Sequence, residues 1–212
     1  MPRSTLLVQA HPRGDSLTAQ VVETVRRKLL ADGGTVDLLD LYAEDFDPRL
    51  TPADEPDWDD REKEYSPEVA AHMERILAAD DIVVVFPVWW FSVPAILKGW
   101  IDRVWNYGFA YGRSRPRLAG RRMLWLGLMG ISAEESAEKG FTAAMDLGLR
   151  VGISEFCGLP DARLRLVHGT DLAGLPVALR AGRVAEVLAE AEEAYAEFDA
   201  SALRSPEAAG RP

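Results

Sequence analysis

Three consecutive aromatic residues, Trp89, Trp90 and Phe91, come directly after an apolar run and a proline. The run, residues 82–86, reads IVVVF, and an uninterrupted apolar stretch of this length is typical of a strand buried on both faces of a parallel sheet. In open α/β sheets, ligands bind at the carboxyl ends of the strands. Indole rings and backbone amides at such a strand end suit a flat, conjugated ligand that forms hydrogen bonds.

A second group of polar residues lies in the loop of residues 10–20, AHPRGDSLTAQ. Ser16 and Thr18 stand at a helix start, where free backbone N–H groups and the positive end of the helix favour an anion. His11 could donate a hydrogen bond to a phosphate, and Arg13 could add positive charge. Taken alone, the loop is explained more simply by Ser16 capping the helix and His11 lying at the surface. Beside the aromatic residues, phosphate binding becomes the better hypothesis.

The elements that must position these two loops alternate between strand and helix along the chain. Apolar runs predict strands over residues 5–10, 36–41, 82–86, 123–129 and 163–167. Apolar residues at helical spacing, with Ser66-Pro67 as a start signal and Gly33-Gly34 as a stop signal, predict the helices. The predicted helices cover residues 17–29, 67–77, 94–105, 139–156 and 177–198.

Five alternations of strand and helix predict an α/β fold with a parallel sheet between two helical layers. The strands at 36–41 and 163–167 carry charges and are expected at the edges, which gives the strand order 2-1-3-4-5. In that order the loops 10–18 and 86–93 flank the topological switch point and should meet. We expect one domain over residues 1–200 and a disordered polar tail over 201–212.

Composition excludes several classes of partner. The chain has 212 residues, enough for one α/β domain, and its net charge of −10 argues against nucleic acid and anionic membranes as partners. No apolar stretch is long enough to cross a membrane and no signal peptide is recognisable. The single cysteine, Cys157, cannot form an internal disulfide, so a cytoplasmic location and a buried, inert thiol are expected.

A long acidic loop, residues 42–65, separates the second strand from the next helix, and loops of this length are usually functional or mobile. Its carboxylates could suggest a metal cluster, but they lack the ligand spacing and turn glycine of a calcium loop, so a solvated charge run and no metal site are expected. Trp58, Trp100 and Trp105 are expected in the core or in a dimer contact, and His72 at the surface. The loop carboxylates considered are Asp54, Glu55, Asp57, Asp59 and Asp60.

Three blocks of sequence carry a family resemblance: His11 with Ser16-Leu17-Thr18, the segment FDPRLTP at 46–52, and the long segment 65–112. Through them the chain resembles the flavodoxin-like NAD(P)H:quinone oxidoreductases. That group includes the mammalian two-electron quinone reductases, the bacterial drug-activity modulators and the flavin-binding ancillary subunits of potassium efflux systems. The likeness covers most of residues 5–170.

The resemblance implies a flavodoxin-like three-layer α/β/α fold with a five-stranded parallel sheet, and a homodimer with the active site at its interface. It implies a non-covalent flavin, FAD from the drug-modulator likeness or alternatively FMN, and NAD(P)H as co-substrate. Tyr111 and Phe109 would line the pocket for nicotinamide and quinone, and Gly130 would touch the pyrimidine edge of the flavin. The phosphate would be held by His11, Ser16, Leu17 and Thr18, and the isoalloxazine ring by Pro87, Val88, Trp89, Trp90 and Phe91.

By the same resemblance, NAD(P)H leaves a hydride on flavin N5 and departs, and a quinone or similar small electrophile then takes it, so the kinetics should be ping-pong. The mammalian enzymes carry a tyrosine and a histidine after the fourth strand, whereas the corresponding loop here, residues 130–141, has neither. Lys139 is the one cation in that loop. Tyr111 and Lys139 are therefore the candidate catalytic side chains.

Three other functions stay open to different degrees. A flavin-bound regulatory subunit of a potassium efflux transporter would need a partner-facing patch, which the sequence does not reveal. A specialised biosynthetic flavin reductase fits the altered loop at 130–141, which would shape the acceptor side. A one-electron carrier is supported only by the acidic pI of about 4.8. The physiological acceptor and the choice between NADH and NADPH are not determined, although Arg113, Arg115 and Arg117 could meet a 2′-phosphate.

Overall fold

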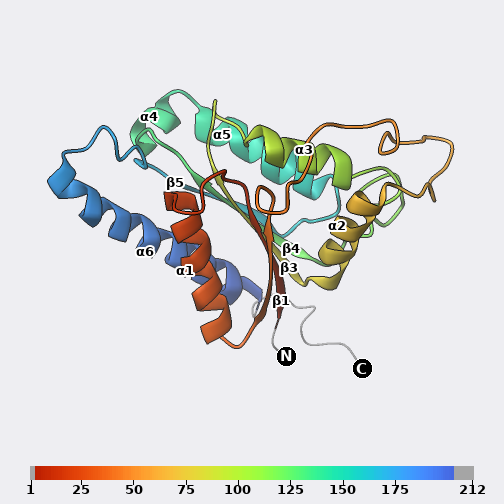
Figure 1. Cartoon of the computed structure of the whole chain (residues 1–212), viewed down its shortest axis with the longest axis horizontal. Coiled ribbons are helices and arrows are strands. Elements are labelled where there is room, and N and C mark those ends of the chain that lie inside the picture. Colours follow the sequence, from red (N-terminus) through yellow and green to blue (C-terminus); the bar gives the residue numbers. More distant parts are fainter. Residues whose placement is uncertain (1–2, 203–212) are drawn as a thin grey trace.

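A computed structural model, which describes residues 3–202, contains one parallel five-stranded sheet in the order β2-β1-β3-β4-β5, as the sequence predicts (Figure 1). Strands β3 and β4 are buried along their whole length and β1 everywhere except at Ser4, whereas β2 and β5 are partly exposed at the edges. The strands are β1 (Ser4–Gln9), β2 (Thr35–Asp40), β3 (Asp81–Pro87), β4 (Arg122–Leu128) and β5 (Ala162–Val167).

Two helical layers cover the sheet, each over its own apolar cluster (Figure 1). One layer consists of α1 (Leu17–Ala31) and α6 (Val177–Ala202), which pack against each other. The other consists of α2 (Pro67–Ala78), α3 (Ala95–Val104), α4 (Ala133–Glu138), α5 (Phe141–Asp146) and the π-helix η1 (Leu147–Glu155). This is the predicted three-layer α/β/α architecture.

The prediction of one continuous helix over residues 139–156 is wrong, because α4 ends before this range and the range itself forms α5 and η1. Helix α4 begins earlier because the Ser132 hydroxyl accepts a hydrogen bond from the Glu135 N–H at 3.2 Å. Helix α4 ends at Glu138, and Gly140, whose φ of 74° is left-handed, separates it from α5. The π-helix η1 then holds Ser154 where its hydroxyl accepts a 2.9 Å hydrogen bond from the buried Trp125 indole.

Two expectations about single side chains have opposite outcomes. The prediction that His72 lies at the surface is wrong: it is 6% exposed, and the acidic loop folds back so that Phe46 packs edge-on against the imidazole at 5.2 Å. Cys157 is buried as predicted, and burial raises the pKa of its thiol to about 12. Residues 201 and 202 belong to α6, while residues 203–212 of the expected tail lie outside the described residues.

No helix within residues 3–202 combines the length and apolar character needed to cross a bilayer.

Candidate functional site

The loops after β1 and β3 meet at the switch point, because these strands are neighbours in the sheet. The His11 and Trp89 rings lie 6.0 Å apart, centroid to centroid. The imidazole Nδ1 accepts a 3.1 Å hydrogen bond from the Arg13 N–H, which leaves Nε2 as the protonated nitrogen of the neutral ring. Partial burial lowers the pKa of His11, so the ring is neutral at pH 7 and its Nε2–H is a donor.

Residues 89–92 form a tight turn that is strained by its residue types. The Trp89 and Ser92 backbones exchange two hydrogen bonds, of 3.1 and 3.0 Å. The two central residues, Trp90 and Phe91, have φ of 51° and 55°. Positive φ at both central positions is the pattern of a type I′ turn, which normally contains glycine, asparagine or aspartate. Each bulky residue in this conformation costs about 1–2 kcal/mol.

The strained turn presents donors and aromatic surface at the carboxyl end of β3. Among residues 3–202 the N–H groups of Trp90 and Phe91 have no hydrogen-bond partner, whereas the Val88 N–H donates to the Leu128 carbonyl at 2.8 Å. The Trp90 side chain is 95% exposed. Of the predicted segment 87–91, therefore, Trp90 and Phe91 offer free backbone donors, Pro87 and Val88 continue the pairing with β4, and Trp89 closes the turn with Ser92.

The loop after β4 is fixed to this turn through Phe141. Its ring stacks on Phe91 with centroids 3.5 Å apart and planes 13° from parallel. Gly130, exposed directly beyond β4, begins this loop. Lys139 lies at the end of α4, where its ammonium donates to Glu135 at 2.6 Å on the same helix. Its charge is thus partly neutralised on an exposed surface.

The loop after β1 forms the expected helix start. The Ser16 hydroxyl accepts a hydrogen bond from the Ala19 N–H at 3.1 Å, so it caps α1. Leu17 and Thr18 are in the first turn, where backbone N–H groups have no partner inside the helix. Thr18 is only 2% exposed as a whole residue, so its hydroxyl does not face the loop surface.

Tyr111 and the strained turn pack against different segments. The turn packs on Phe141, at the start of α5, whereas Tyr111 follows α3 in the chain and packs near the end of η1. Tyr111 is half-buried and packs 5.7 Å from Phe156, at the end of η1. Within one chain the structure therefore does not bring Tyr111 to Trp90. Phe109 is 2% exposed and lies beneath the Arg117 guanidinium, so it belongs to the core.

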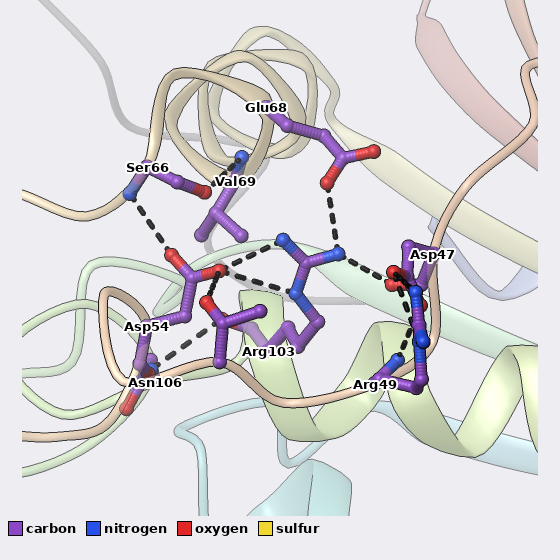
Figure 2. A network of polar contacts seen from close by, with 9 residues as sticks. Asp47, Arg49, Asp54, Ser66, Glu68, Val69, Arg103 and Asn106 are labelled. Carbon is purple, nitrogen blue, oxygen red and sulfur yellow. Dashed lines mark hydrogen bonds and ion pairs between the residues drawn. The ribbon is translucent and has the colours of Figure 1, made fainter.

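Figure 2 shows a buried ionic network that sequence reasoning missed. The prediction of a fully solvated charge run is wrong for Asp54, whose carboxylate receives a 2.8 Å hydrogen bond from Arg103. Glu68 also pairs with Arg103, at 2.8 Å, and the Ser66 N–H donates to Asp54 at 2.9 Å. Burial alone would raise the pKa of Asp54, but the hydrogen bonds from Arg103 and Ser66 lower it overall. The spacing of these residues gave no signal of this pairing.

The acidic loop carries one exposed tryptophan, Trp58. Trp100 and Trp105 are buried as predicted, but Trp58 is 64% exposed and not part of the core. Its indole packs edge-on to Tyr107 at 5.1 Å and lies 6.2 Å from Tyr111. Within residues 3–202, no three histidine, cysteine or acidic side chains converge as metal ligands.

A cavity of about 510 Å³ lies at the free edge of β5, away from both loops of the switch point. Its lining includes His168 and the apolar residues Leu164 and Leu166. Partial burial lowers the pKa of His168, and its Nε2 is buried without a hydrogen-bond partner among the described residues. The cavity does not include the turn at 89–92.

Comparisons with known proteins agree with this fold. A profile of the flavodoxin-like fold family matches residues 3–197. The chain is 41% identical over 164 residues to the uncharacterized NAD(P)H oxidoreductase YcaK of Escherichia coli, covering 77% of this chain and 83% of that protein. It is 29% identical over 204 residues to NAD(P)H dehydrogenase (quinone) 1 of Rattus norvegicus, covering 79% and 74% of the two chains.

The solved structure of an NAD(P)H:quinone oxidoreductase from Methanothermobacter marburgensis superposes with a TM-score of 0.78 and 23% identity. The superposition covers 91% of this chain and 96% of that one. At this identity the shared property is the fold.

Proposed function

Because this chain belongs to the flavodoxin-like fold family and is an oxidoreductase, we propose that it transfers a hydride from NAD(P)H, through a non-covalently bound flavin, to a quinone or a similar small electrophile. The observation that carries the proposal is the strained turn at 89–92, which exposes an indole and two free N–H donors beside a helix start. Backbone strain of this kind persists where function requires it.

The residues of the switch point fit a flavin. A bound flavin would supply the hydride-accepting and hydride-donating chemistry that amino-acid side chains lack. The N–H groups of Leu17 and Thr18, with the neutral His11, are donors suited to its phosphate. The N–H groups of Trp90 and Phe91 are donors suited to carbonyl and nitrogen acceptors on a conjugated ring.

We further propose that the active enzyme is a homodimer in which each site uses residues of both chains. Within one chain the turn with Trp90 packs on the start of α5, whereas Tyr111 packs against Phe156 at the end of η1, so the two residues face different parts of the molecule. The face of η1 also exposes two large apolar side chains, Leu147 at its start with 64% and Phe156 directly after its end with 66% exposure. Apolar surface of this kind marks an interaction site in soluble proteins. A second copy that covers this face would carry its own Tyr111 toward Trp90.

Tyr111 has the properties of a substrate-orienting donor. Burial raises the pKa of its phenol, so the group stays protonated at neutral pH. Its hydroxyl has no hydrogen-bond partner among the described residues, which leaves it free to donate to a quinone carbonyl. Lys139 is the candidate counter-charge after β4, although its ion pair with Glu135 would have to loosen.

The absence of a disulfide partner for Cys157 is compatible with a reducing cytoplasm.

The test is the visible spectrum of the purified protein under anaerobic conditions, with NADPH or NADH added and then menadione. A flavin spectrum that NAD(P)H bleaches and menadione restores is expected, and chromatography of the released cofactor separates FAD from FMN. The Tyr111→Phe variant should keep the spectrum and lose turnover with menadione. A protein that neither contains nor takes up a flavin would overturn the proposal.

A further inference from the structure

A row of aromatic rings continues from Tyr111 onto the acidic loop. Trp58 packs against Tyr107 at 5.1 Å and lies 6.2 Å from Tyr111, while Phe156 packs on the other side of Tyr111 at 5.7 Å. The outer rings, Trp58 and Phe156, are the most exposed, and Tyr111 is half-buried between them. An exposed indole next to the proposed acceptor site is a surface on which a planar molecule can stack.

The loop that carries Trp58 is fixed to the protein along α3. Arg103 of α3 donates a hydrogen bond to the Asp54 carboxylate at 2.8 Å, and the Asn106 side-chain amide donates to the Asp54 carbonyl at 2.5 Å (Figure 2). Two glycines permit close backbone approach: a Cβ on Gly99 would lie 2.2 Å from the Pro48 carbonyl oxygen, and one on Gly108 would lie 2.1 Å from that of Arg61. Trp58 is therefore presented from a docked segment rather than from a free loop.

The turn around Trp58 carries uncompensated negative charge. Two neighbouring acids of the loop have cationic partners, Asp54 with Arg103 and Glu62 with Arg113. Within residues 3–202 no ion pair involves the three exposed acids next to Trp58 in the sequence, Asp57, Asp59 and Asp60, although the Asp57 and Asp60 carboxylates accept backbone N–H groups of the loop. Of the nearby cations, the Lys63 ammonium is held by the Glu55 carbonyl at 2.6 Å, and Arg61 remains exposed.

We propose that Trp58, with Asp59 and Asp60, forms an acceptor subsite beside Tyr111 that selects planar aromatic acceptors carrying a positive charge. An indole face attracts a cation, and adjacent carboxylates add to this attraction while repelling anionic acceptors. This inference rests on the proposed function. NAD(P)H supplies the hydride, and the quinone takes it with one solvent proton to give the hydroquinone. The cationic substituent is bound but not altered.

The test measures equilibrium binding without turnover. Calorimetry compares 10-methylacridinium, a planar cation, with acridine at a pH where acridine is neutral, using the protein as purified and no NAD(P)H. We expect the cation to bind about tenfold more tightly at low salt, and this preference to shrink in high salt because exposed charges are screened. Equal affinity for the two probes would overturn the proposal.

Substitutions then show which residues cause the preference for the cationic probe. Asp59→Asn/Asp60→Asn should bring the preference for the cation down to about twofold, since the indole remains. The matched control is Glu192→Gln/Glu193→Gln, which removes the same charge from an exposed part of α6 and should leave the preference unchanged. Trp58→Phe should retain part of the affinity for both probes, and Trp58→Ala should lose most of it. If the α6 variant lowers the preference as much as the loop variant, the effect is global and the subsite is wrong.

The same proteins distinguish this inference from the proposed function. Reduction of the bound flavin by NAD(P)H and reoxidation by menadione, a neutral quinone, report the function. The ratio of kcat/KM for a quaternary-ammonium quinone over a sulfonated quinone reports the subsite. Normal menadione turnover with a ratio near one would refute the subsite alone, whereas a protein without flavin reduction would refute the function.

Discussion

The guanidinium of Arg103 meets the carboxylate of Asp54 at 2.8 Å, and the two side chains are only 4% and 0% exposed. The pair joins α3 to a loop that lies 49 residues earlier in the chain. Hydrogen bonds from Ser66 and Asn106 saturate the Asp54 side chain and backbone. This buried pair is one of several contacts that fix the acidic loop, so the position of Trp58 depends on it.

Removing one member of this pair should strongly destabilise the protein. Asp54→Ala leaves the Arg103 charge buried without its main partner, and we expect a loss of about 3–5 kcal/mol in the free energy of unfolding, measured in urea. The control is Arg49→Ala, whose ion pair with Asp47 is exposed and should leave the urea midpoint unchanged. Asp54→Leu/Arg103→Met should be less destabilised than Asp54→Ala. A midpoint for Asp54→Ala equal to wild type would contradict the buried pairing.

Relieving the strained turn should stabilise the protein while impairing function. Trp90→Gly removes a side chain that buries almost no surface and allows the positive φ without steric cost, so a gain of about 1 kcal/mol is expected in urea unfolding. Flavin retention and menadione turnover should fall. Trp58→Gly removes an equally large indole at a position without positive φ and should not stabilise. A lower urea midpoint for Trp90→Gly would show that the turn is not strained.

Subunit complementation tests whether Trp90 and Tyr111 act from different chains. Trp90→Gly and Tyr111→Ala homodimers should each be inactive. After unfolding and refolding an equal mixture, half of the dimers are mixed and each has one intact site, so about one quarter of wild-type activity should return. If both residues served the same site from one chain, mixing would restore nothing. A monomeric mass in solution would also contradict the shared site.

His72 should make the stability depend on pH. Burial lowers the pKa of its imidazole, and Nδ1 has no hydrogen-bond partner among the described residues. The folded state therefore binds a proton less readily than the unfolded state, so the stability is complete above the unfolded pKa of about 6.5 and falls as the pH drops through that range. His72→Leu should flatten the difference in unfolding free energy between pH 7.5 and pH 5. An unchanged pH dependence would exclude His72 as its source, leaving His11 and His168.

Much of the fold was determined by local sequence. Apolar runs and helix caps are written in consecutive residues, so the five strands, their order and the meeting of the loops after β1 and β3 could be predicted. Predictions failed where a contact joins distant segments. Phe46 buries His72 from 26 positions away, and Arg103 removes Asp54 from solvent across 49 positions, and neither pairing has a periodic signature.

The features of the candidate site also separate into those set by local sequence and those set by tertiary contacts. The sequence determined that aromatic residues follow β3 and that a helix start faces them, because both are local features. Only the tertiary structure decided that Trp90 and Phe91 adopt positive φ, since the ends of the turn are fixed by the Trp89–Ser92 hydrogen bonds and by packing of Phe91 on Phe141. Only the tertiary structure placed Tyr111 apart from Trp90 within one chain, because the turn packs on Phe141 at the start of α5 whereas Tyr111 packs on Phe156 at the end of η1.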